Sequence, residues 1–224
     1  MARNISGKSS SSHTDIVTQH VRDEIASGNY PPGERLREAN ISELLGISRT
    51  PIREAIRVLE TEGLIVIEPW KGIKVAELNR NQMMDFFLFR ETLEGLAAGL
   101  AAAAVSDDEL EKMEAILLKT ETAERDTLSD LVDSNEAFHQ MFFDVAKNRF
   151  LTQSLDVLKT ARLLLRGNVY RIEGVWKSSC EEHRAILSAL SDRDAETASE
   201  AARRHVRSSA LASLSLKLES EISA

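Results

Sequence analysis

Three histidines in the second half of the chain, His139, His183 and His205, lie on apolar faces of predicted helices. Each has apolar residues three or four positions away, as Phe143 is from His139, so the periodicity turns all three rings inward. A buried imidazole needs a polar partner, and one divalent ion such as zinc or nickel would satisfy all three rings. Asn135 shares a helix face with His139, four residues away. The alternative is a polar pocket that hydrogen-bonds a bound molecule directly.

Arg90 is the other candidate for binding chemistry, because Phe86, Leu93 and Ala97 share its helix face. A buried guanidinium needs an anion. One possible anion is the carboxylate of Glu94, four residues on, in a simple ion pair. The other is the carboxylate of a bound ligand, which arginine holds through two parallel hydrogen bonds. The residues alone leave both open.

A first helix is expected at about residues 15–27, with Thr14 as its N-cap. A helix-turn-helix follows it and precedes the binding residues in the chain. Gly46 suits the left-handed turn that ends one helix, Ser48 is a good N-cap for the next, and Pro51 falls in its first turn. The apolar stripe of that second helix is Ile52, Ala55, Ile56 and Leu59. The polar residues at its start or off the stripe are Arg49, Thr50, Arg53 and Arg57. The start of such a helix enters the major groove, so we predict that these four side chains contact DNA.

A short hairpin follows the recognition helix. Residues 64–67 form an apolar, β-branched run, residues 69–72 form a turn, and residues 73–75 alternate. This pattern predicts a "wing". Lys71 and Gly72, in its turn, are expected to approach the DNA backbone or minor groove.

The first third of the chain resembles the winged-helix domain of GntR-type bacterial transcription regulators. The resemblance is carried by YPPGERL at residues 30–36, LGISRTPIREAI at residues 45–56 and LETEGL at residues 59–64. We count Arg35, within the first of these motifs, among the DNA contacts. The sequence departs from the family pattern at residues 37–40, where Asn40 and Glu43 form a possible capping box of their own.

Residues 80–215 resemble the all-helical, FCD-type ligand-binding domain of the FadR branch of this superfamily. The local signatures are RETLE at 90–94, NEAFH at 135–139, Asn148, EHRAIL at 182–187 and Arg204-His205. Relatives often carry an aspartate and three histidines as metal ligands, and Asn135 stands where the aspartate would be. The resemblance therefore implies a metal at Asn135, His139, His183 and His205, and a small carboxylate or sugar-acid effector at Arg90. It also implies a homodimer on a pseudo-palindromic operator.

Composition agrees with a soluble, mostly helical protein. Residues 1–78 hold 10 basic and 11 acidic side chains, so the net charge of −8 belongs mainly to the second part of the chain. A single cysteine excludes an internal disulfide framework and suits a reducing cytoplasm. The most apolar stretch, residues 93–105, is too short to span a membrane, and the polar N-terminus does not resemble a signal peptide.

We therefore predict a mostly α fold with a disordered arm at 1–13, a winged helix-turn-helix at 14–78 and an antiparallel bundle of about six helices at 79–224. The six helices are expected at about 81–105, from 107, at 128–146, 150–165, 175–190 and from 193 nearly to the C-terminus. Six helices are typical of the VanR-like subset. The predicted function is a cytoplasmic transcription regulator, more in keeping with a repressor than an activator. The alternatives are a metal-dependent enzyme acting on a small organic acid and an effectorless DNA-binding protein. No convincing general base is found for an enzyme, because Glu136 and Glu182 lie next in sequence to Asn135 and His183 and so turn about 100° away from them.

Overall fold

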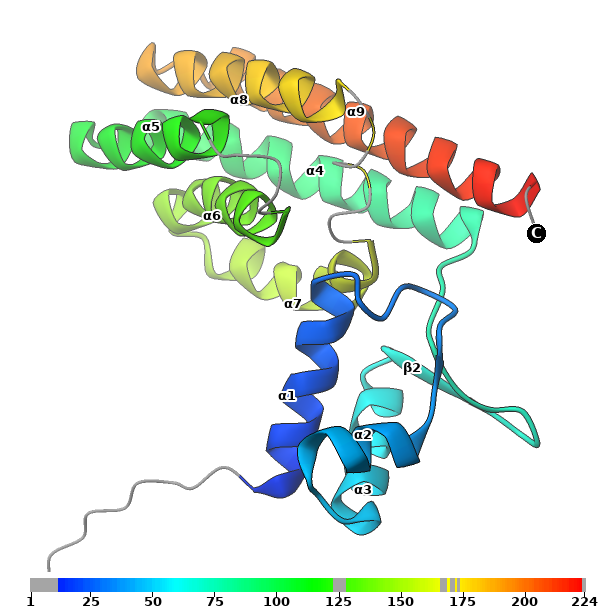
Figure 1. Cartoon of the computed structure of the whole chain (residues 1–224). Helices are drawn as coiled ribbons and strands as arrows, with labels where there is room; N and C mark the ends of the chain where they lie inside the picture. The colour runs from blue at the N-terminus through cyan, green and yellow to red at the C-terminus, as the bar shows by residue number, and fades with distance from the viewer. Residues whose placement is uncertain (1–11, 123–127, 166–168, 170–171, 173, 223–224) are drawn as a thin grey trace, which may run out of the picture. The chain divides into compact units, whose positions relative to one another are not determined.

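A computed structural model describes residues 12–122, 128–165, 169, 172 and 174–222, with residues 128–130 and 220 described by their backbone alone. The chain divides into two compact units, Met1–Glu77 and Leu78–Ala224 (Figure 1). Most of the predicted N-terminal arm, residues 1–11, lies outside the described residues. Ser12 and His13, which were assigned to that arm, already cap and open the first helix.

The first unit is a winged helix-turn-helix. Its elements are α1 (His13–Ala26), β1 (Arg35–Leu36), α2 (Glu38–Leu45), α3 (Arg49–Thr61), β2 (Ile65–Glu68) and β3 (Gly72–Val75). The strands form one antiparallel sheet in the order β1-β3-β2, with Ile67 opposite Ile73 in the hairpin. The predicted hairpin is confirmed. The two-residue strand β1, which pairs with β3 at the edge of the sheet, was not predicted.

Local sequence explains most of the helix boundaries in this unit. Gly46 ends α2 with φ +66°, as the turn prediction required. The predicted stripe of α3 is confirmed, since Ile52, Ala55, Ile56 and Leu59 are all buried.

Two capping predictions were wrong. Ser12 caps α1 in place of Thr14, because Ser12 and Asp15 bond reciprocally in a capping box. The alternative cap at Asn40 does not form either. Asn40 lies inside α2, whose N-cap is Arg37 and has no side-chain hydrogen bond.

The second unit is a bundle in which the described residues form six helices, as predicted. They are α4 (Arg80–Ala104), α5 (Asp107–Thr122), α6 (Leu128–Ala146), α7 (Arg149–Leu165), α8 (Val175–Ser191) and α9 (Ala195–Ile222). The core takes large side chains from α6 and α8, such as Phe138, Phe142 and Ile186. Four alanines of α4, Ala97, Ala98, Ala101 and Ala102, are fully buried. Helix α4 runs close beside α9: a Cβ on Gly95 would lie 2.6 Å from Cγ of Arg203.

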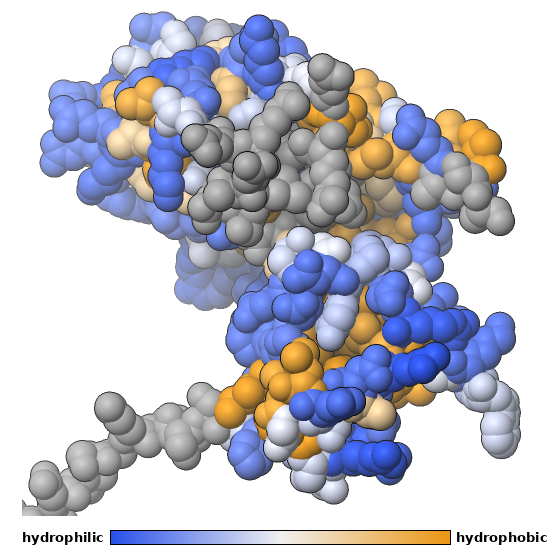
Figure 2. Space-filling view, in the orientation of Figure 1, coloured by the Kyte–Doolittle hydropathy of each residue, from blue (hydrophilic) through white to orange (hydrophobic). Residues whose placement is uncertain are grey.

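The surface of the bundle is not uniformly polar. Figure 2 shows apolar surface near the end of the helical unit where α9 finishes. Four exposed apolar residues recur on α4 at multiples of four positions, namely Met84, Leu88, Leu96 and Leu100. None of the helices in the described part of the chain is sufficiently long and apolar to cross a membrane.

Candidate metal centre, effector cavity and DNA-binding face

Three histidine rings meet inside the helical unit. His139 comes from α6, His183 from α8 and His205 from α9, and each side chain is only 1% exposed. One ring nitrogen from each lies within 4.8 Å of the others, and Nε2 of His139 is 3.2 Å from Nε2 of His183. Two nitrogens bound to one zinc at the usual lengths would be roughly 3.3 Å apart. The structure thus brings the three predicted residues together with spacing that suits a single ion.

Two of these rings have a carboxylate on their far side. Oε2 of Glu94, on α4, lies 2.8 Å from Nδ1 of His139, at ion-pair distance although the alignment falls short of a hydrogen bond. Nδ1 of His205 lies 2.8 Å from Oε2 of Glu182, at hydrogen-bond distance. In the sequence analysis Glu94 was only a partner for Arg90, and Glu182 was set aside because it points away from its neighbour His183. The only feature of the sequence that marks Glu94 is its place as a single acidic residue in the alanine-rich stretch at 93–105.

Burial and charge set the protonation of this cluster. Desolvation lowers the pKa of His139 to about 4, against the opposing charge of Glu94. Desolvation, then the neighbouring histidines, also hold the pKa of His183 well below its usual value. Burial alone would raise the pKa of Glu94, but Arg90 and then His139 outweigh it and hold the pKa well below the ordinary range. Neutral imidazoles beside an anionic carboxylate are the forms that bind metal cations.

Asn135 adds an oxygen to the donor set. It lies one turn before His139 on α6 and is 8% exposed. Its Oδ1 is buried and has no hydrogen-bond partner among the described residues. A buried amide oxygen without a partner is costly unless something else binds it. The residues therefore fit a divalent metal: three buried imidazoles with ring nitrogens within 4.8 Å of one another, one unsatisfied oxygen, and carboxylates behind two of the rings.

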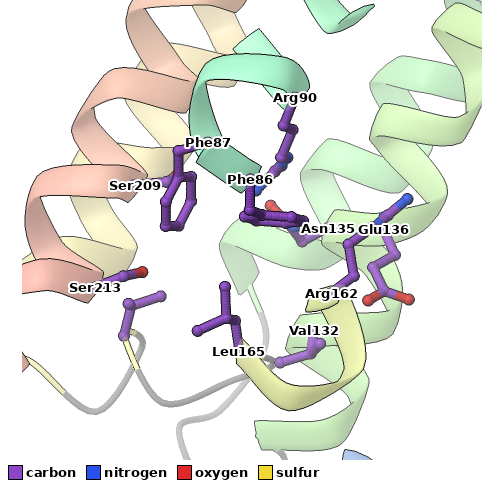
Figure 3. Close-up of a pocket in the computed structure, with 11 residues that line it drawn as sticks. Phe86, Phe87, Arg90, Val132, Asn135, Glu136, Arg162, Leu165, Ser209 and Ser213 are labelled. Carbon is purple, nitrogen blue, oxygen red and sulfur yellow. The ribbon is translucent and has the colours of Figure 1, made fainter. Parts of the chain in front are cut away.

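Arg90 pairs with Glu94 and also lines a cavity. Its Nε lies 2.6 Å from Oε1 of Glu94, so the ion pair is present. It also lines a cavity of about 60 Å³, and in Figure 3 it reaches toward Asn135 there. The other lining residues are Phe86, Phe87, Val132, Glu136, Arg162, Leu165, Val169, Ser209 and Ser213. The histidines do not line this cavity. A second hollow of about 500 Å³ between α6 and α7 shares Glu136 and Arg162 with it.

The predicted DNA contacts all lie on the surface of the first unit. Exposed residues are Arg35, Arg49, Thr50, Arg53, Arg57, Lys71 and Gly72. Two of them are held by neighbours: Nε of Arg53 donates to Oε2 of Glu38 at 3.0 Å, and Arg35 donates to the carbonyl oxygen of Lys71 at 2.6 Å. Arg35 therefore braces the wing.

Trp70, at the tip of the wing, is a surface feature that sequence reasoning treated only as part of a turn. Its side chain is fully exposed, and its backbone has φ +66°. An exposed tryptophan beside Lys71 suits contact with a nucleic acid. Its only signal in the sequence was its place between Pro69 and Lys71.

A winged helix-turn-helix followed by a six-helix unit with a buried histidine cluster defines a class of DNA-binding protein with a separate regulatory unit. Comparison with family profiles agrees: the profile "Bacterial regulatory proteins, gntR family" matches residues 14–75, and that of the FCD domain matches residues 85–208. The chain belongs to the GntR family of transcription regulators and carries an FCD domain. Members of this family are regulators and not enzymes, so the catalytic alternative is set aside.

Individual relatives agree over most of the chain. The HTH-type transcriptional regulator YdhC of Bacillus subtilis is 31% identical over 188 residues, which are 81% of this chain and 80% of the relative. A probable D-xylose utilization operon transcriptional repressor of Paenarthrobacter nicotinovorans is 30% identical over 194 residues, 85% of each chain. Among solved structures, E. coli McbR/YncC has the same fold, with a TM-score of 0.71 at 22% identity, covering 88% of this chain and 94% of that one.

Proposed function

We propose that this regulator is a cytoplasmic homodimeric repressor whose affinity for a pseudo-palindromic operator is set by a small carboxylate or sugar acid. The observation that carries the proposal is the division of polar residues between the units. The first unit presents arginines of α3 to solvent. The second unit buries a histidine cluster and holds a half-buried arginine in the wall of a cavity. A relative named as a probable D-xylose utilization operon transcriptional repressor supports the repressor role.

The DNA-binding role is assigned to α3 and the wing. The start of α3 would read the major groove through Arg49 and Arg53, with Thr50 on a phosphate. Arg49→Ala should weaken binding to DNA from upstream of the regulated gene by tenfold or more, measured by fluorescence anisotropy at fixed salt. Arg149→Ala, an exposed arginine of the helical unit, is the matched control. If Arg49→Ala and the control bind this DNA with equal affinity, Arg49 and the start of α3 do not contact the operator.

The metal role is assigned to His139, His183 and His205, with Asn135 as a fourth donor. A bound zinc or nickel ion would supply a Lewis-acidic position for carboxylate oxygens. Protein purified without chelators should contain about one divalent ion per chain by elemental analysis, and His183→Ala/His205→Ala should contain none. His13→Ala, at an exposed histidine of α1, should keep the ion. If the unaltered protein contains no ion, the alternative is favoured, in which the histidines form a polar pocket that hydrogen-bonds a bound molecule directly.

The effector role is assigned to Arg90. A cavity of about 60 Å³ is far below the usual ligand-pocket range of roughly 300–1,000 Å³, which favours a small acid. Regulation requires the acid to bind the DNA-competent and incompetent states with different affinities. Native mass spectrometry should find a co-purifying acid that Arg90→Ala loses. A ligand retained at full affinity by Arg90→Ala would exclude this residue, and no acid with any affinity would favour an effectorless DNA-binding protein.

The homodimer is assigned to the helical unit. The exposed apolar residues of α4 would be covered by a second copy, as exposed apolar stripes usually mark an interface. Leu88→Glu/Leu96→Glu should shift the mass from dimer to monomer in size-exclusion chromatography with light scattering. Leu118→Glu, at an exposed leucine of α5, should leave the mass unchanged. A dimer in both variants would place the interface elsewhere.

A further inference from the structure

The two carboxylates of the histidine cluster contact the same atom of their rings. Glu94 lies 2.8 Å from Nδ1 of His139, and Glu182 lies 2.8 Å from Nδ1 of His205. A ring that carries its proton on Nδ1 keeps a lone pair on Nε2. In His139 that Nε2 lies on the side of the cluster, 3.2 Å from Nε2 of His183. A proton on Nδ1 is therefore the arrangement that turns the lone pairs toward the shared centre.

Glu94 is anchored on both of its oxygens. Oε1 accepts a hydrogen bond from Nε of Arg90 at 2.6 Å, while Oε2 faces His139. The side chain is 4% exposed, so rotating this carboxylate into water would leave Arg90 without its anion. Arg90 in turn lines the cavity. One buried carboxylate thus connects the cavity wall to the histidine cluster.

His183 is different from the other two rings. Its Nδ1 is buried and has no hydrogen-bond partner among the described residues, and the same is true of Oγ of Ser179, one turn earlier on α8. No carboxylate within ion-pair distance of this ring is found in the described part of the chain. The cluster is consequently asymmetric, with two rings held by anions and one held by packing against Phe138, whose ring centroid is 4.7 Å away.

We propose that Glu94 and Glu182 are positioning residues, which hold His139 and His205 in the Nδ1–H form with Nε2 aimed at a common metal position. The inference rests on the proposed metal site, and it adds residues and roles that the three histidines alone do not define. Carboxylates behind metal-binding histidines fix the ring orientation and raise its basicity, and their loss typically weakens metal binding ten- to a hundredfold.

The test begins with metal-free protein. Long-range ¹H–¹⁵N NMR of histidine-labelled protein, treated with a chelator and then dialysed, reports which nitrogen of each ring carries the proton. We expect Nδ1–H for His139 and His205. Glu94→Gln should change the signal of His139 and leave that of His205, and Glu182→Gln should do the reverse. A merely structural role for either glutamate would not move one ring alone.

The second measurement is Co²⁺ binding, followed by visible absorption. Glu94→Gln and Glu182→Gln should each weaken Co²⁺ binding by about ten- to a hundredfold. Glu91→Gln is the matched control: it lies one turn before Glu94 on α4, and its carboxylate pairs with Nε of Arg207 at 3.1 Å. If Glu94→Gln does not fold, Glu182→Gln still decides, because its side chain is 17% exposed and lies at the edge of the cluster.

The two measurements separate this inference from the proposed function. If each glutamine variant changes the tautomer of its own histidine but the protein binds no Co²⁺, the positioning role is supported and the proposed metal site is rejected. Co²⁺ affinity within twofold of the unaltered protein in both variants, or Nε2–H forms for His139 and His205 in the metal-free protein, would overturn the positioning role even if the ion binds.

Discussion

Replacing Arg90 with methionine should reveal a buried charge. Methionine keeps much of the length of the arginine stem but removes the cation 2.6 Å from Oε1 of Glu94, whose side chain is 4% exposed. Removing one partner of a buried pair typically costs about 3–5 kcal/mol, because the other charge stays in a medium that solvates it poorly. The cost of Arg90→Met is therefore dominated by what happens to Glu94.

Protonation limits how far an unpaired Glu94 charge can destabilise the folded variant. From the ordinary carboxyl pKa of 4.5, placing a proton on Glu94 at pH 7 costs about 3.4 kcal/mol, at 1.36 kcal/mol per unit. The protein need not exceed this cost, since it can take up the proton instead. His139, at 2.8 Å, offers a second place for that proton and can only lower the cost. We expect Arg90→Met to lose about 3–5 kcal/mol of unfolding free energy at pH 7, because the variant also loses the stabilisation that Arg90 gives to the charged form of Glu94.

Urea unfolding in the presence of a chelator measures this loss. Trp176 on α8 reports on the helical unit, whereas Trp70 is already fully exposed in the folded protein. Arg207→Met is the control: its exposed pair with Glu91 should contribute little to stability, because water and salt screen it. In the double variant Arg90→Met/Glu94→Gln the buried anion is gone, so we expect it to be more stable than Arg90→Met alone. Equal losses for Arg90→Met and Arg207→Met would refute the reasoning.

Three further perturbations follow from particular contacts. Gly46→Ala should destabilise the first unit by about 1–2 kcal/mol and Gly46→Asn by less, measured by hydrogen exchange of α2 and α3; the added Cβ meets no atom, so the cost is the left-handed backbone alone. Leu59→Ala, at a fully buried position, should cost about 2–5 kcal/mol by the same measurement. Arg184→Gln should lower the melting temperature at pH 7 but not at pH 3. The hydrogen bond from Arg184 lowers the pKa of Glu121, so that pair stabilises the fold above pH 4.5 and is lost as pH falls through the lowered pKa; an equal shift at both pH values would contradict this assignment.

Periodicity predicted the elements of this fold because burial on a regular helix is periodic. The stripe of α3 and the six helices of the bundle follow directly from apolar residues at three- and four-residue spacing. The errors lie where several residues compete for one local role. Ser12 and Thr14 are both able to cap α1, and the reciprocal bond with Asp15 decides for Ser12. Strand β1 has only two residues, too few for any alternation to be visible.

Periodicity gives the face on which a side chain lies but not its partner on another helix. It turned His139, His183 and His205 inward, and their meeting needed only that the helices pack together. The same reasoning set Glu182 aside, because it lies about 100° around α8 from His183. In a bundle, however, a residue turned away from one neighbour can face another, and Glu182 reaches His205 on α9. A carboxylate next to an inward histidine should therefore be examined against histidines on adjacent helices before it is assigned to solvent.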